Sequence, residues 1–109
     1  MRKLHIALGV SSLSDSIADY TQRLSAQPCV TVPDNYALWR TDAVNFSIRQ
    51  ITSGEVPGLR HLGWEGMGEG ALASSSETRD CNGIVWEEFN AQQQLQEILA
   101  HWPHAEVRP

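Results

Sequence analysis

The sequence predicts a single α+β domain over residues 1–109, in which a βαβββ unit is followed by a shortened second unit with a C-terminal helix. Three observations lead to this fold class. An alternating segment near the N-terminus precedes a segment with a helical stripe, three short extended segments follow, and a later segment resembles the first. A chain of 109 residues is long enough for one hydrophobic core and too short for two.

The first unit is expected over residues 3–51. Apolar residues alternate with small or polar residues over 3–10, which is the period of a strand, and the alternation places His5 on the less apolar face. Ser12 is typical of a helix N-cap, so a helix is expected near residues 13–25, with an apolar stripe that packs on the sheet. Three further strands are expected at residues 29–32, 36–40 and 44–51, with turn-forming residues between them.

A linker rich in small residues and proline leads to the second unit, residues 59–109. Its first strand, 59–65, carries His61 where the first strand of the chain carries His5, 56 residues earlier. This spacing suggests a weak internal repeat. Residues 66–83 are rich in glycine and serine and predict a long loop, which interrupts the repeat.

The chain is expected to close with a strand at residues 84–89 and a helix that begins near Asn90 and ends at Pro103. Residues 104–109 form either a tail or a last edge strand, so the sheet is expected to have about six strands, within the usual range. The buried stripe of the helix is expected to contain Leu95, Ile98, Leu99 and Trp102.

Composition excludes several classes of protein. Apolar residues make up 41% and charged residues 19% of the chain, as in an ordinary globular protein. The net charge of −5 and the absence of a basic stripe argue against nucleic-acid binding, and no apolar run is long enough to cross a membrane. Cys29 and Cys81 show no metal-type spacing, and the short apolar stretch after the N-terminus contains His5, so we expect a cytoplasmic protein with reduced thiols.

His5 and His61 are the strongest candidates for chemistry. Imidazoles from equivalent strands of a repeated unit can point into one cleft, and a carboxylate from a neighbouring strand would complete a two-histidine, one-carboxylate metal site. Glu87 and Glu88 are the available carboxylates, and only one of them can face the cleft if they lie on a strand. The alternative is that both histidines are half-buried strand residues satisfied by backbone or water.

The chain resembles the vicinal oxygen chelate superfamily, which includes glyoxalases, bleomycin-resistance proteins and ring-cleaving dioxygenases. The likeness is strongest over residues 4–51, where the segment from His5 to Tyr20 is similar to the opening strand and helix of the family. Residues 36–39 and 44–48 are similar to the third and fourth strands of the family. In the second module, His61 stands at the start and residues 80–87 resemble the closing turn and strand.

This resemblance implies a divalent metal, Fe(II), Mn, Ni or Zn, held by His5, His61 and Glu87, which binds two oxygens of the substrate. It selects Glu87 over the neighbouring glutamate. Glyoxalase-type members take a second carboxylate from the fourth strand, where this chain has Phe46 or Ser47. The ligand set is therefore expected to contain three residues, as in the dioxygenase branch.

The second module has only 18 residues between Glu65 and Ile84, too few for the helix and two strands of the family. The cup around the metal would then be open on one side, so a homodimer is expected to cover it. The alternative is that the C-terminal helix covers it within one chain. The residues expected to contact the substrate are Trp39, Phe46 and Trp64, and the alternative for the tryptophans is a place in the core or an interface.

The first hypothesis for function is a metal-dependent enzyme of the glyoxalase or dioxygenase type that acts on a small oxygen-bearing substrate. The sequence names no catalytic residue beyond the expected metal ligands. Two alternatives stay open. One is a metal-free member of the same fold that binds a small molecule, and the other is a protein-interaction module.

Overall fold

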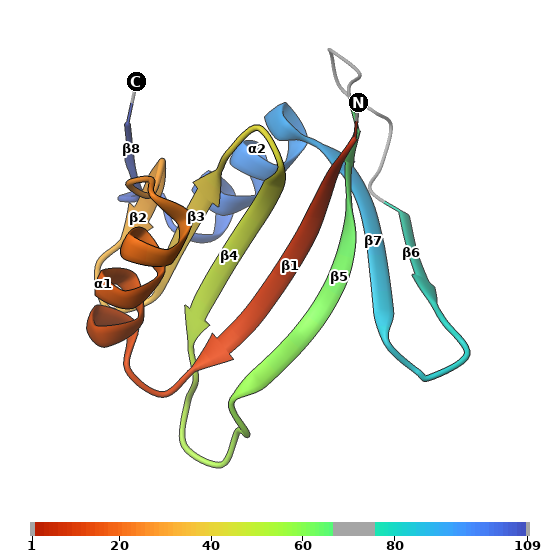
Figure 1. Ribbon diagram of the computed structural model, residues 1–109, viewed down its shortest axis with the longest axis horizontal. Coiled ribbons are helices and arrows are strands. Elements are labelled where there is room, and N and C mark those ends of the chain that lie inside the picture. Colours follow the sequence, from red (N-terminus) through yellow and green to blue (C-terminus); the bar gives the residue numbers. More distant parts are fainter. Residues whose placement is uncertain (1, 67–75, 109) are drawn as a thin grey trace.

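The computed structural model describes residues 2–66 and 76–108, and within them eight strands and two helices form an α+β fold around one mixed sheet (Figure 1). The predicted α+β class is therefore confirmed. Across the sheet the strands follow the order β6-β7-β5-β1-β4-β3-β2-β8. In chain order the elements are β1 (Lys3–Val10), α1 (Leu13–Leu24), β2 (Val30–Val32), β3 (Tyr36–Arg40), β4 (Val44–Gln50), β5 (Gly58–Gly66), β6 (Ser76–Arg79), β7 (Val85–Asn90), α2 (Ala91–His101) and β8 (Glu106–Val107).

Helix α1 has defined signals at both ends. The Ser12 side chain accepts a hydrogen bond from the backbone N–H of Asp15, which caps the first turn. At the other end Ser25 adopts a left-handed conformation, with φ 51°, and its N–H bonds to the carbonyl oxygen of Gln22, so the helix cannot continue. The predicted span, near residues 13–25, agrees with α1.

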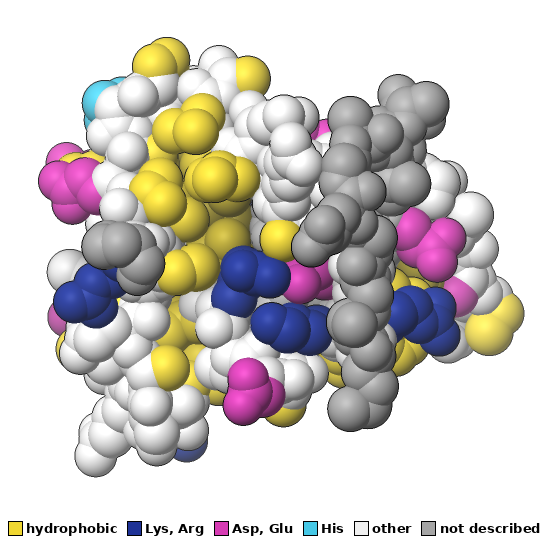
Figure 2. Space-filling model, turned by 90° about the horizontal axis from the view of Figure 1, so that it is seen from above, with side chains coloured by type: hydrophobic (Ala, Val, Ile, Leu, Met, Phe, Trp, Pro, Cys, Tyr) yellow, Lys and Arg dark blue, Asp and Glu magenta, His cyan; other side chains and the backbone are white. Residues whose placement is uncertain are grey.

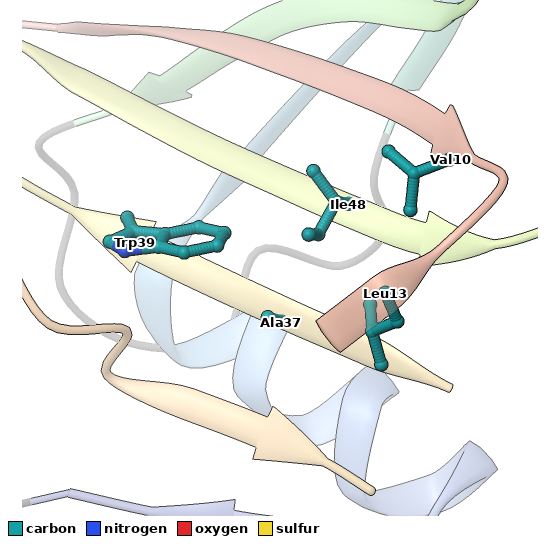
Figure 3. Close-up of a cluster of buried hydrophobic side chains, with 5 residues drawn as sticks. All are labelled: Val10, Leu13, Ala37, Trp39 and Ile48. Carbon is teal, nitrogen blue, oxygen red and sulfur yellow. The ribbon is translucent and has the colours of Figure 1, made fainter. Parts of the chain in front are cut away.

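The apolar side of α1 packs on one face of the sheet and forms the first hydrophobic cluster (Figure 3). Trp39 is fully buried there, and its indole N–H donates to the carbonyl oxygen of Ala26 at 3.0 Å. Because the ring is buried and its one polar atom has a hydrogen-bond partner, Trp39 is an anchor of this face. The buried members of the cluster are Val10, Leu13, Ala37, Trp39 and Ile48.

Helix α2 covers the opposite face of the same half of the sheet (Figure 1). It begins after Asn90, whose side chain accepts from the N–H of Gln93. Ile98 is buried, Leu95 and Trp102 are partly buried against the sheet, and Trp102 stacks on Tyr36. The sheet residues beneath the helix are Val30, Val32, Tyr36 and Leu38. Leu99 is an exception to the predicted stripe, because 37% of it is exposed.

The sequence did not predict β6, and it left β8 open as the alternative to a tail. β6 lies inside the segment expected to be a loop, residues 66–83, and pairs antiparallel with β7. β8 has two residues and pairs with β2 at the other edge of the sheet. Neither strand has an apolar alternation, because all of its residues are exposed, so the pairing partner decides its conformation. The prediction of about six strands was therefore too low, and residues 67–75 of the expected loop lie outside the described residues.

The central strand β1 joins the two halves of the sheet. It runs parallel to β4 and antiparallel to β5, and β5 in turn runs parallel to β7.

In the view of Figure 2 the basic side chains form small groups beside acidic ones and no continuous basic stripe. Within the described part of the chain, neither helix has the length and apolar character needed to cross a membrane.

Candidate metal centre

His5, His61 and Glu87 project from three adjacent strands, β1, β5 and β7. The register explains why they meet. His5 on β1 lies opposite Gly63 on β5, Glu87 on β7 lies opposite the same glycine, and His61 is two residues before it on the same strand. One donor atom from each of the three side chains lies within 4.8 Å of the others. The structure thus brings together the three residues that the sequence suggested as ligands.

The two adjacent glutamates on β7 face opposite sides of the sheet. The Glu87 side chain points toward His61, with its Oε2 3.2 Å from His61 Nε2. Glu88 is exposed, and its carboxylate lies 3.9 Å from the guanidinium of Arg2. Strand alternation therefore places a single carboxylate beside the histidines.

His5 is 2% exposed and has a fixed orientation. Its Nδ1 lies 2.8 Å from Oδ1 of Asn45, its register partner on β4. The Asn45 amide nitrogen donates to Glu65 Oε1 at 2.8 Å, so the oxygen of the same amide must face the imidazole as an acceptor. His5 Nδ1 therefore carries the proton, and in the neutral ring the Nε2 lone pair points toward His61.

A buried polar network supports Asn45. Arg40 donates to both oxygens of Glu65, at 2.7 and 2.8 Å. Burial raises the pKa of Glu65, but the hydrogen bonds from Arg40 and Asn45 outweigh burial and hold the pKa below its ordinary value. Gln94 of α2 accepts from the Asn45 amide at 2.7 Å, so the helix also contributes to the position of His5. This chain of contacts orients one imidazole from four other elements, β3, β4, β5 and α2.

The pKa values of His5 and Glu87 are both lowered, which favours the neutral imidazole and the carboxylate. Burial lowers the pKa of His5, the hydrogen bond with Asn45 opposes this, and the proximity of His61 lowers it again. The hydrogen bond from His61 lowers the pKa of Glu87, although burial acts in the other direction. A neutral imidazole and a carboxylate are the ligand forms of these side chains.

The spacing of the donors also suits a metal ion. His61 Nε2 lies 3.0 Å from His5 Nε2 and 3.2 Å from Glu87 Oε2. Two ligands bound about 2.0–2.2 Å from one ion at roughly 90–110° have donor atoms about 3.0–3.5 Å apart. Two imidazole nitrogens and one carboxylate oxygen form a donor set that Fe(II), Mn, Ni and Zn accept. The residues present therefore fit a divalent transition metal.

The three donors open into a cavity of about 250 Å³. The sheet forms its floor, and α2 forms one wall with Ile98 and Trp102. Phe89 packs edge-on against the His5 ring, at 4.9 Å between ring centroids, and restricts its rotation. Tyr36 lines the cavity, and its phenol bonds to Ser47. Burial raises the pKa of this tyrosine to about 12, so the phenol is a neutral hydrogen-bond donor at neutral pH.

Two arginines, Arg49 of β4 and Arg60 of β5, line the same cavity. Burial lowers the pKa of the Arg60 guanidinium, and the positive charge of Arg49 nearby lowers it further. Among the residues that the structure describes, neither guanidinium forms an ion pair. A positively charged group therefore lies beside the two imidazoles and the carboxylate.

The residues expected to contact the substrate lie elsewhere. Trp39 and Phe46 belong to the hydrophobic cluster beneath α1, on the face of the sheet opposite His5. Trp64 is also on that opposite face, where it packs near Trp86 and beneath the guanidinium of Arg2. None of the three lines the cavity. For Trp39 the alternative of a core position is the correct one.

Sequence reasoning missed four residues of this site. Asn45 and Arg49 had a signal, because the alternation of their strand already separated them from Phe46. Gln94 had none, since its contact with Asn45 depends on where α2 packs. Arg60 had none either, because regular strand alternation places it on the face opposite His61.

No family model matches this chain, and no curated protein matches it significantly.

Proposed function

We propose that this protein is a metal-dependent enzyme of the glyoxalase or dioxygenase type, with His5, His61 and Glu87 as the metal ligands and a small oxygen-bearing molecule as substrate. The observation that carries the proposal is the convergence of the three donors in a cavity, with the His5 lone pair fixed by Asn45. Surface carboxylates and histidines rarely have such support, whereas metal-binding histidines typically do.

A bound divalent ion supplies Lewis acidity toward substrate oxygens. The chain provides the remaining functions. Asn45 keeps the His5 proton on Nδ1, so that Nε2 stays available, and the Tyr36 and Ser47 hydroxyls offer neutral hydrogen bonds inside the cavity. Ile98 and Trp102 exclude water from the side covered by α2.

We also propose that β1, α1, β2, β3 and β4 form the first βαβββ module of the vicinal oxygen chelate arrangement, and that the second module is the shortened one. The like positions of His5 on β1 and His61 on β5, each facing the cavity, support this view. Helix α2 packs over the sheet on the face that carries the ligands.

The proposal predicts one transition-metal ion per chain in protein purified without chelator. Glu87→Gln should weaken binding of Zn²⁺ or Mn²⁺ by at least the roughly 10–100-fold seen when an outer-shell partner is lost. Glu88→Gln, one residue away on the other face, should bind as the native chain does. Elemental analysis and calorimetric titration measure both. Equal effects of the two substitutions, or no stoichiometric metal, would contradict the proposal. Absence of metal would favour a metal-free binding or interaction module, which thermal shifts with small ligands can separate.

We also expect the protein to be a homodimer. On the α1 face of β1 and β5, the apolar residues Ile6, Leu62 and Trp64 lie outside the cluster beneath the helix and are only half-buried. Pairing of this face between two copies would remove apolar area from water. β6 is a less suitable contact, because Glu77 and Arg79 put charge on the sheet edge. Sedimentation equilibrium at micromolar concentration should give twice the mass of one chain, and a Leu62→Lys variant should give a single chain. A monomeric native protein would contradict this prediction.

A further inference from the structure

The position of Arg60 results from an irregularity in the pairing of β1 with β5. Ala7 lies opposite His61 and Leu8 lies opposite Leu59, so Arg60 is the extra residue of a β-bulge. In a regular strand, Arg60 would face the side opposite His61. The bulge turns it, and both side chains line the same cavity.

Arg49 reaches the same place from the other neighbour of β1. It lies opposite Gly9 of β1, on the face of β4 that also carries Asn45 and Ser47. Gly9 has no side chain, and a Cβ there would be 3.7 Å from both Cγ and Cδ of Arg60 and 2.9 Å from Ile51. The aliphatic part of Arg60 therefore lies over this glycine. Two guanidinium groups from strands on either side of β1 therefore line the same cavity.

Several groups surround this pair of arginines. Glu87 and Glu55 attract the Arg60 charge only from a distance, beyond the 4 Å of an ion pair. Glu97 and His101 of α2 and Tyr36 of β3 also line the cavity. Arg49 is half-buried and Arg60 is exposed. Within the described residues neither guanidinium group has a carboxylate at ion-pair distance, so the two positive charges share one cavity without a direct partner.

We propose that Arg49 and Arg60 form an oxyanion clamp, and that the substrate is a small organic acid. Its oxyanion lies against the two guanidinium groups, while another oxygen faces His5, His61 and Glu87. Only the contact with His5, His61 and Glu87 rests on the proposed function, and the contact with the two arginines does not. Guanidinium groups bind carboxylate and phosphoryl oxygens with paired hydrogen bonds. A cavity of about 250 Å³ is smaller than the roughly 300–1,000 Å³ of pockets for drug-sized ligands, so the acid has few carbons.

The clamp can be tested without metal or activity. Calorimetric titration of chelator-treated protein with malonate and with inorganic phosphate should show saturable binding of at least one anion. Arg49→Gln and Arg60→Gln should each weaken it about tenfold or more, the effect of losing a charged hydrogen-bond donor. Arg108→Gln, which removes the same charge from an exposed position beside β8, should leave it unchanged. Tighter binding of malonate assigns a carboxylate substrate, and tighter binding of phosphate assigns a phosphoryl one.

Two results would overturn the clamp. One is the absence of saturable binding of both anions to the native chain. The other is an equal loss in the Arg60→Gln and Arg108→Gln variants, which would reduce the effect to net charge. Metal titration of Arg60→Gln separates this inference from the proposed function, because the variant keeps all three metal ligands. In that variant, weakened anion binding with normal metal binding is the result that the clamp predicts. In the native chain, normal metal binding without anion binding contradicts the clamp alone, and anion binding without metal binding contradicts the metal site alone.

Discussion

Replacing Asn45 with alanine is expected to weaken metal binding by roughly 10–100-fold and to lower the free energy of unfolding by about 2–5 kcal/mol. Asn45 is fully buried between β1 and β3. Its amide nitrogen donates to Glu65 and to Gln94, and its oxygen faces His5 Nδ1. Alanine removes all of these contacts at once, so a buried carboxylate loses one of its two hydrogen-bonding partners and the imidazole loses its acceptor.

The effect on the metal arises from the tautomer of His5. Without the Asn45 oxygen nothing holds the proton on Nδ1, and the Nε2 lone pair is available for only part of the time. Nitrogen-15 NMR of the imidazole groups should report the Nδ1-protonated form in the native chain and a mixture in Asn45→Ala. Calorimetric metal titration and urea denaturation measure the other two effects.

Asn82→Ala is the matched control for Asn45→Ala, because Asn82 is exposed in the turn before β7. It should bind metal as the native chain does and lose little stability. An Asn45→Ala variant that unfolds more easily but keeps the native His5 tautomer and metal affinity would limit Asn45 to a structural role.

Gly63→Ala is expected to have the second largest effect. A Cβ at this position would lie 2.3 Å from the backbone carbonyl oxygen of Glu87 and 3.1 Å from its backbone nitrogen. These atoms belong to a paired strand and not to a flexible side chain, so β7 must shift away from β5. The expected cost is about 1–3 kcal/mol of stability from overpacking. Because Glu87 moves with its strand, metal affinity should fall roughly tenfold or more.

Gly66→Ala provides the control on the same strand. A Cβ at Gly66 would be 3.7 Å from the nearest backbone oxygen, which is an ordinary contact. Urea denaturation and metal titration should therefore place Gly66→Ala close to the native chain and Gly63→Ala well below it. If the two variants behave alike, the close approach of β5 and β7 does not determine the position of Glu87.

The strand and helix boundaries of the first half followed from local patterns. The alternation of residues 3–10 separated His5 from Ile6, and the cap at Ser12 located the start of α1. The same alternation showed that Glu87 and Glu88 cannot share a face. Each of these conclusions depends only on neighbours along one segment, which is why they could be reached without the structure.

The second half of the chain was harder to predict. β6 and β8 have exposed residues with no apolar period, so only their pairing with β7 and β2 makes them strands. Leu99 was placed on the buried stripe of α2, but the helix contacts the sheet through a narrower face centred on Ile98. The width of that face depends on what lies beneath the helix, and a helical period does not contain this information.

By itself the sequence determined which side of its own strand or helix most residues occupy, and it named the two histidines and the carboxylate. Only the tertiary structure decided which strand faces lie together. It placed Asn45 beside His5 across 40 residues of chain and His61 beside His5 across 56. It also placed Trp39 and Phe46 beneath α1, away from the ligands, and used a bulge to turn Arg60 into the cavity. The reason is physical, because local periodicity reflects burial within one segment, whereas register and bulges result from pairing between segments far apart in the chain.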